Sequence, residues 1–445
     1  MRASALKYAL VSALASIVMV ILVVLPFHAF LTVWGASIVG HYTALRLWKE
    51  VLLLLCVIGV LYLVLMDHKI RSHTLTRRLV WVIFVYIAVN IIWGLVAYHQ
   101  HGVSLKAMAY GVLLNTRFLI FFLVVWAIAL RTERLRNRWQ PLILYPAAIV
   151  VVFGLLQVFV LPHNFLGHFG YNEATIYPYE TINHNQNYIR IMSTLRGANP
   201  LGAYLLIPIS VLSVLIIRGK RSWQYVAFLV ASLVVLFLTF SRGAWIGAVI
   251  MIGVILLLSL RSARSKQWAL GIAGACVVLL LGLAAVAHNN ARFENVFLHT
   301  QQHSASPTSS NQGHLTALKS GLHDISHQPL GKGTGSAGPA SVYNNHPARI
   351  AENYYIQIGQ ELGFIGLGLF LLINVGVGYL LWLRREDTLA LCLLASFIGI
   401  SFVNLLSHAW TDDTLAYLWW GLAAIAMVNV AQPPKAAKAK TKAKS

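Results

Sequence analysis

Pro329-Leu-Gly-Lys-Gly-Thr-Gly335 lies at the centre of a polar segment, Gly313 to Gly366, that interrupts an otherwise apolar chain. This segment is neither apolar enough to lie in lipid nor basic enough to resemble a cytoplasmic loop. It delivers Glu352-Asn353 to the start of a long apolar run. The stretches on both sides resemble membrane spans. A polar loop that carries a carboxylate above a helical bundle indicates a site at a membrane face.

The first part of this segment is predicted to be a short amphipathic helix. The glycines at 331–338 do not form a P-loop, because the Gly-x4-Gly-Lys-Ser/Thr order is missing and no strand precedes them. They are expected to let the loop fold tightly over the bundle. The apolar face of the amphipathic helix consists of Leu315, Leu318, Leu322 and Ile325.

The composition excludes a soluble globular protein. Of the 445 residues, 58% are hydrophobic and only 11% are charged, whereas soluble domains carry roughly 25% charged residues. The net charge of +21 does not indicate nucleic acid, because the basic residues lie in short clusters between apolar runs, as in cytoplasmic loops. The cysteines and histidines lack metal-ligand spacing. We therefore expect no metal and no cofactor.

The apolar runs are long enough to cross about 30 Å of hydrocarbon, and we count twelve spans. Most lysines and arginines fall in the loops that are cytoplasmic if the N-terminus is inside, as the positive-inside rule requires. Both termini are then cytoplasmic. The predicted spans are 8–27, 48–66, 79–98, 107–130, 140–161, 200–217, 223–240, 243–260, 268–287, 354–382, 388–407 and 415–431.

The predicted fold is therefore all-α and polytopic, with a long extracytoplasmic loop between spans 9 and 10. Residues 1–287 form a bundle of spans 1–9, and residues 288–353 form the outer loop with short amphipathic helices. Residues 354–431 supply spans 10–12. Residues 432–445 form a disordered basic tail near anionic lipid.

Two arginines at the outer ends of spans are candidates for binding phosphate. Arg190 precedes the span at 200, and Arg242 lies in Ser241-Arg242-Gly243 between two spans joined by almost no loop. A guanidinium held at this boundary can grip a diphosphate through two hydrogen bonds. The alternative is an arginine that anchors a helix end by snorkelling. Arg196, beside a Gly-Ala-Asn turn, is expected to be structural.

Two glutamates mark the long apolar run that ends at Trp382. Glu352 precedes its first turn, where the helix dipole favours an acid and where a carboxylate could also act as a general base. Glu361 lies deeper, where an acidic side chain is costly unless it is paired. We expect its partner to be Arg117, which interrupts the fourth span, in a structural ion pair.

These residues together resemble the O-antigen ligase/polymerase superfamily of bacterial membrane glycosyltransferases. The resemblance covers about residues 185 to 380, and the span count agrees with it. Four motifs of the family occur in order: an arginine-bearing entry to a span at Arg190 to Asn199, Ser241-Arg242-Gly243-Ala-Trp245, an amphipathic helix followed by Pro329-Leu-Gly-Lys-Gly333, and Asn353 with Gly363 and Gly366.

The resemblance implies an enzyme that takes a glycan from undecaprenyl diphosphate at the outer face of the plasma membrane and transfers it to an acceptor hydroxyl. Arg190 and Arg242 would engage the diphosphate. The family's histidine before the asparagine is replaced here by Glu352, which is expected to be the base with His314 assisting. Ser241, Asn353 and Gly333 would support the site. The expected partners are the lipid-linked donor, a glycan, lipid or protein acceptor, and membrane lipids.

Three alternatives stay open at this stage. A polymerase of the same superfamily would extend a lipid-linked chain, whereas a ligase would join the glycan to another anchor. The span count alone would suit a polysaccharide-lipid transporter, although the polar groups gather at the outer face and not at the midplane. A membrane scaffold would explain the helices but not the two arginines.

Overall fold

The structure, a computed structural model, describes residues 2–75, 77–182, 185–219, 222–260 and 310–431. Within these ranges, eight helical segments are long and apolar enough to cross a membrane, and three shorter apolar helices accompany them. Each predicted span coincides with one of these helices, except 268–287, which lies outside the described residues together with 288–309 and 432–445. The chain is a mostly helical, multi-pass membrane protein, and the number of twelve spans stays a prediction.

Helices make up most of the described chain, with short 3-10 helices (η) and one strand pair between them. In chain order the elements are α1 (Arg2–Val24), η1 (Leu25–Phe27), α2 (His28–Val39), α3 (Tyr42–Leu45), α4 (Trp48–Met66), α5 (His68–Leu75), α6 (Arg78–His99), α7 (Leu105–Ala129), α8 (Arg134–Asn137), α9 (Trp139–Phe159), η2 (Phe165–Phe169), β1 (Glu180–Ile182), β2 (Asn185–Arg190), α10 (Ala198–Ile217), α11 (Trp223–Leu238), α12 (Arg242–Ser259), α15 (Ser310–His327), η4 (Gly338–Tyr343), α16 (Tyr354–Leu383), α17 (Thr388–Asn404), η5 (Ala409–Thr411) and α18 (Asp413–Ala431).

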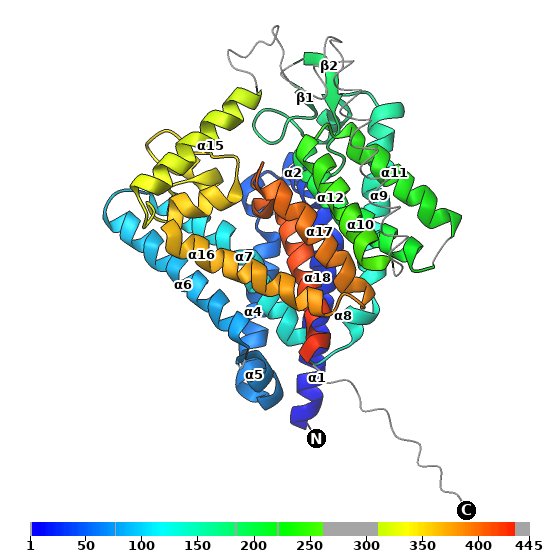
Figure 1. The fold of residues 1–445 in the computed structure, drawn as a ribbon, viewed down its shortest axis with the longest axis vertical. Helices are drawn as coiled ribbons and strands as arrows, with labels where there is room; N and C mark the ends of the chain where they lie inside the picture. Colours follow the sequence, from blue (N-terminus) through cyan, green and yellow to red (C-terminus); the bar gives the residue numbers. More distant parts are fainter. Residues whose placement is uncertain (1, 76, 183–184, 220–221, 261–309, 432–445) are drawn as a thin grey trace, which may run out of the picture.

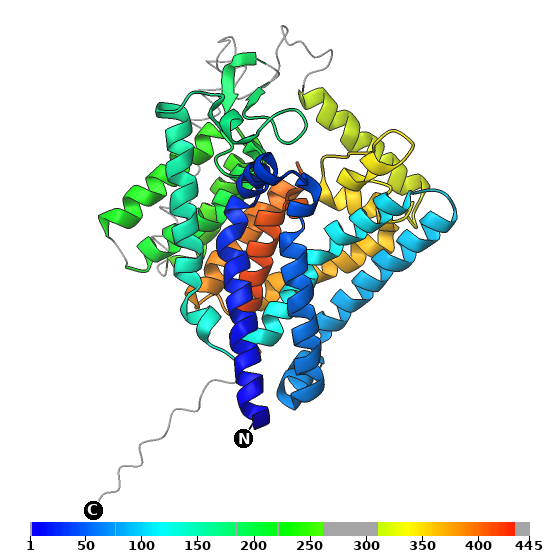
Figure 2. The ribbon, with the colours of Figure 1, turned by 180° about the vertical axis from the view of Figure 1, so that it is seen from behind.

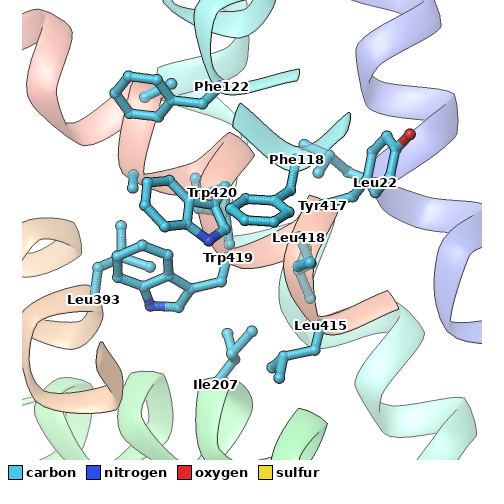
Figure 3. Close-up of a cluster of buried hydrophobic side chains, with 14 of the residues drawn as sticks. Leu22, Phe118, Phe122, Ile207, Leu393, Leu415, Tyr417, Leu418, Trp419 and Trp420 are labelled. Atoms are coloured by element: carbon cyan, nitrogen blue, oxygen red, sulfur yellow. The ribbon is translucent and has the colours of Figure 1, made fainter. Parts of the chain in front are cut away.

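Helix α18 forms the centre of the bundle (Figures 1 and 2). It packs against α1, α7, α10, α16 and α17, and its side chains from Leu415 to Val428 are buried. Trp419 and Trp420 point in different directions from this helix, and Trp420 meets Phe118 of α7 at a ring distance of 5.2 Å (Figure 3). A helix that is apolar on all sides is expected to be enclosed by its neighbours.

Helix α16 is broken at Gly363, where φ is 62° and ψ is −161°. The glycine-rich loop fills the break. The backbone N–H of Phe364 donates to the carbonyl of Pro329 at 2.9 Å, and the N–H of Gly333 donates to the carbonyl of Glu361 at 2.8 Å. The predicted span over 354–382 is present as α16, but it is broken at this point, where loop carbonyl and amide groups replace the bonds of one helical turn.

The side chain of Glu361 holds the glycine-rich loop in place through hydrogen bonds. It is fully buried and accepts hydrogen bonds from the N–H of Gly335 at 2.8 Å and from Nδ2 of Asn115 in α7 at 2.7 Å. Beside it, the hydroxyl of Thr334 donates to the carbonyl of Asn90 in α6 at 2.8 Å. A buried carboxylate is tolerated when such donors satisfy it. The loop is therefore bound to α6, α7 and α16 at once.

The glycines of the loop permit this close fit, as expected. Gly333 has a positive φ of 94°, and a Cβ atom at this position would overlap Ala97 of α6. The adjoining helix α15 is also present as predicted. Its Ile325 is buried against Ile356 of α16, whereas Leu315 and Leu322 stay exposed, so the expected apolar face is only partly covered.

One departure from the all-α prediction is a small strand pair. β1 and β2 are antiparallel, and the register places Glu180 opposite Arg190. The pair lies at the end of the bundle that also carries α15 (Figure 1). Short, polar strands of this kind lack the apolar periodicity that predicts a strand from sequence.

The break at Gly363 gives a stability prediction. Gly363→Ala should destabilise the protein by about 1–3 kcal/mol from backbone strain alone, because only glycine adopts this region of φ and ψ without strain. The overlap of the new Cβ with the carbonyl oxygen of Pro329 should add to this loss. Thermal unfolding in detergent measures the effect. The matched control is Gly368→Ala in the same helix, where a Cβ meets nothing within 4 Å. Equal melting temperatures for the two variants would contradict the proposed role of the break.

Candidate active site

Arg190 is held at the end of β2 by three partners. Its Nε donates to the carbonyl of Thr239 at 2.9 Å, and its Nη2 donates to Oδ1 of Asn199 at 2.6 Å. Its Nη1 lies 3.5 Å from a carboxylate oxygen of Glu180. Burial lowers the pKa of Arg190, and Glu180 opposes this effect. The guanidinium is thus oriented by the link between α11 and α12, which carries the second arginine.

Arg242 begins α12 directly after that short link. The link turns sharply, since Phe240 has a positive φ of 49°, and Trp245 secures it by donating from Nε1 to the carbonyl of Leu236 at 3.0 Å. Arg190 donates to the carbonyl of Thr239, three residues before Arg242, so both arginines lie at the same short link. The structure therefore brings together the two arginines predicted to bind a diphosphate. Two guanidinium groups at one link are suited to an anion that both can contact.

Glu352 and His314 are also in contact, as expected if Glu352 is the base and His314 assists it. Nδ1 of His314, on α15, forms an ion pair with Oε2 of Glu352, just before α16. The hydrogen bond from His314 lowers the pKa of Glu352, while partial burial acts in the opposite direction and His408 adds to the lowering. Glu352 has a positive φ of 52°, an uncommon conformation that often occurs at functional positions.

The two pairs lie on either side of the turn that follows α17. Nδ2 of Asn353 donates to the carbonyl of Leu405 at 2.9 Å, and Gly243 packs against the side chain of Leu406. Asn353 also caps α16, because its Oδ1 accepts from the N–H of Ile356 at 3.0 Å. The starts of α12 and α16 and the end of α17 therefore share one end of the bundle.

The three residues expected to support the site have structural partners. Asn353 fixes α16 to the end of α17 as described above. Ser241 is buried and precedes α12, where it lies against Gly202 of α10. Gly333 lies within the loop that closes the break of α16. Each of these residues therefore positions an element next to the site.

Sequence reasoning missed a group of polar residues between α17 and α18. Burial lowers the pKa of His408 to about 4, and nearby Glu352 raises it. Asp412 is buried, and one of its carboxylate oxygens lies 3.3 Å from Nε of Arg196. Arg196, expected to be structural, therefore forms an ion pair. Burial raises the pKa of Asp412, and Arg196 lowers it. The available signal was an acidic pair, Asp412-Asp413, between two apolar runs of a chain that has few acids.

A cavity of about 590 Å³ lies next to these residues. Its walls include Glu180, the partner of Arg190, and the ion pair of Arg196 and Asp412. Arg190, Arg242 and Glu352 themselves do not line it. The cavity therefore adjoins Arg190 through Glu180.

Two residues of the cavity wall, His28 and Asp413, belong to a buried charge network that connects α2, α4, α7 and α18. Asp413 accepts from Nζ of Lys49 at 2.9 Å and forms a second ion pair with Arg117. Glu50 lies 3.1 Å from both cations, and His28 lies 3.4 Å from Asp413. Lys49 and Arg117 are almost fully buried. Two acids thus compensate two cations inside the bundle.

The expected ion pair between Arg117 and Glu361 is wrong. Arg117 pairs with Glu50 and Asp413, and its Nη2 donates to the carbonyl of Thr411 at 2.8 Å. Glu361 is instead satisfied by an amide side chain and a backbone N–H. Asn115 precedes Arg117 by two residues on α7, so the two side chains project from different faces of that helix.

Among the described residues, no group of three or more histidines, cysteines and acids could hold a metal ion. The site consists instead of arginines, a carboxylate–histidine pair and a polar loop at one end of apolar helices. This arrangement is suited to binding an anion beside a proton acceptor.

Residues 226–371 match the O-antigen ligase family. The match confirms the resemblance to the O-antigen ligase/polymerase superfamily and supports a membrane enzyme of this kind. It includes Arg242, His314 and Glu352, and Arg190 lies before it. No curated protein matches the chain.

The charge network of this O-antigen ligase-like chain gives a second stability prediction. Asp413→Asn should cost about 3–5 kcal/mol, because it leaves Lys49 and Arg117 buried with one acid between them. Thermal unfolding in detergent measures the loss. Glu173→Gln, at an exposed position on the rim of the same cavity, removes one acid without uncovering a buried cation and should change little. A similar loss in both variants would contradict the role assigned to Asp413.

Proposed function

We propose that this protein transfers a glycan from undecaprenyl diphosphate to an acceptor hydroxyl at the outer face of the plasma membrane. The observation that carries the proposal is that Arg190 and Arg242, 52 positions apart in sequence, lie at the same link between α11 and α12, at the end of the bundle that also holds Glu352 and His314. The family match supports a glycosyltransferase that uses lipid-linked glycans.

The arginines are suited to the leaving group. When the bond between the anomeric carbon and the diphosphate oxygen breaks, negative charge grows on the diphosphate. Arg190 is already oriented by its partners, and a preorganised guanidinium stabilises such a charge at little reorganisation cost. The donor would offer Arg190 an anion in place of Glu180, its partner in the free protein, and Arg242 would add a second cation at the same link.

Glu352 is suited to the acceptor. As the acceptor oxygen forms its bond to the anomeric carbon, its hydroxyl proton passes to the carboxylate of Glu352. His314 holds that carboxylate in place through its hydrogen bond. The products are the extended acceptor and undecaprenyl diphosphate, and the mechanism needs no metal or redox step.

Ligase and polymerase differ only in the acceptor, and both use the same chemistry. A ligase would place the glycan on a lipid or protein anchor, and a polymerase would place it on another lipid-linked chain. A transfer assay with purified protein and a lipid-diphosphate oligosaccharide separates them: a ladder of products indicates a polymerase, and a single shift of an added acceptor indicates a ligase. Intact donor with every acceptor, together with movement of donor across vesicle membranes, would indicate a transporter.

The same assay tests the diphosphate site. Arg242→Ala should lower the transfer rate about 10²–10³-fold, the usual effect of removing one stabilising group at a developing charge. Arg242→Lys should retain part of the rate, because it keeps the charge but loses the paired hydrogen bonds. Arg71→Ala is the control, since Arg71 is exposed in α5 at the opposite end of the molecule (Figure 1). Full activity of Arg242→Ala would overturn the assignment.

The pH dependence of transfer tests the base. The pKa of Glu352 is lowered chiefly by the hydrogen bond from His314, so the carboxylate is ionised at neutral pH and the rate should fall only as the pH drops through this pKa. His314→Gln removes the bond and should move the acid limb of the pH–rate profile to higher pH.

Glu352→Gln should lower the rate about 10²–10⁴-fold, as is typical of losing a general base. It should also remove the acid limb that Glu352 causes. If Glu352→Gln leaves the transfer rate unchanged while Arg242→Ala still lowers it, Glu352 is not the base, and the assignment of the diphosphate site is unaffected.

A further inference from the structure

A second cavity lies outside the proposed active site, between α1 and α9. Its volume is about 700 Å³. It runs along α1 and η1 from Ser16 to Phe27, and along α9 from its N-cap residue Arg138 to Ile149. Each of these stretches covers roughly 16 Å at the rise of an α-helix, about half of the 30 Å hydrocarbon thickness. The groove thus has the length of one leaflet. Figure 2 shows the two helices side by side at the front of the molecule.

The walls of this groove are apolar and face outward. Val20, Tyr145 and Ile149 are at least half exposed in the protein alone, although they lie within membrane-spanning helices. Met19 and Leu142 line the floor. Apolar side chains exposed within the hydrocarbon region contact lipid chains, and a concave wall of this length fits an acyl chain better than a flat helix face does.

One end of the groove is basic. Arg134 and Arg138 line it there, and neither forms an ion pair with a carboxylate of the described residues. Arg134 instead donates to the hydroxyls of Ser16 at 3.0 Å and Ser12 at 3.5 Å. Arg136, between them on the same short helix, lies 3.7 Å from Asp387 and does not line the groove.

We propose that this groove binds one phospholipid with an anionic headgroup, whose phosphate contacts Arg134 and Arg138 and whose acyl chain lies between α1 and α9. Charge complementarity selects this occupant: two cations that pair with no carboxylate among the described residues meet the head, and an apolar wall one leaflet long meets the tail. Basic pockets between transmembrane helices at the cytoplasmic side commonly hold such lipids. The site is independent of glycan transfer.

A polyprenyl chain is the competing occupant. The apolar end of the groove reaches Phe27, next to His28 in the wall of the cavity near the active site. A donor tail that entered from that end would place hydrocarbon against Arg134 and Arg138, which is unfavourable. The phospholipid satisfies both ends of the groove, so it is the occupant we propose.

Native mass spectrometry of the full chain tests the proposal. The protein, stripped of lipid in detergent, is mixed with phosphatidylglycerol or phosphatidylcholine of the same acyl composition. The wild type should retain one phosphatidylglycerol and little phosphatidylcholine. In Arg134→Gln/Arg138→Gln, affinity for phosphatidylglycerol should fall about 30-fold, or roughly fivefold for each lost arginine near a membrane surface. Arg136→Gln removes the same charge from the same helix and should bind like the wild type.

A second variant tests the contribution of the acyl chain separately from that of the headgroup. Val20→Trp with Ile149→Trp fills the groove without changing charge and should also abolish retention of phosphatidylglycerol. Melting temperatures measured without added lipid confirm that each variant folds. Equal retention of the two lipids, or an equal loss in Arg136→Gln, would overturn the proposal. Displacement of phosphatidylglycerol by polyprenyl phosphate at equal concentration would assign the groove to the donor tail and overturn it as well.

Discussion

The closure of the broken helix α16 by the glycine-rich loop is the constraint on which the end of the bundle that carries the proposed site depends. Within or near lipid, every backbone amide and carbonyl needs a partner inside the protein. A break at Gly363 would leave such groups unpaired, and the loop supplies the missing partners through Pro329 and Gly333. Glu361 then binds the loop to α7. The first part of α16 can therefore carry Glu352 to the site without exposing its backbone.

The buried charges beneath the cavity complete this arrangement. Lys49, Arg117, Glu50 and Asp413 come from three helices, and each would be costly alone in apolar surroundings. Their mutual compensation determines how α4, α7 and α18 are rotated against one another. Asp413 also lines the cavity, so the buried charges connect the core of the bundle to the polar region near the site.

Most residues of the proposed active site could be predicted from the sequence, because they belong to motifs. The position of Arg242 between two closely spaced apolar runs and the position of Glu352 before a long one both indicated the outer ends of helices. The contact of His314 with Glu352 agrees with the pairing expected from their roles. The contribution of His408 and Asp412 was not foreseen, since neither stands in a recognised motif. The ion pair of Arg196 with Asp412 was also not foreseen, although Arg196 lies within the first motif and was expected to be structural.

The sequence by itself determined the apolar spans, the polar segment between 313 and 366, and the identity of the charged groups at the ends of helices, because hydrophobicity and local motifs are properties of consecutive residues. Only the tertiary structure decided which charges meet. Arg117 pairs with Asp413, 296 positions away in the chain, and not with Glu361, because the rotation of α7 presents Asn115 to one neighbour and Arg117 to another. The break at Gly363 was likewise decided in three dimensions, since a distant loop must supply the hydrogen bonds that the helix gives up.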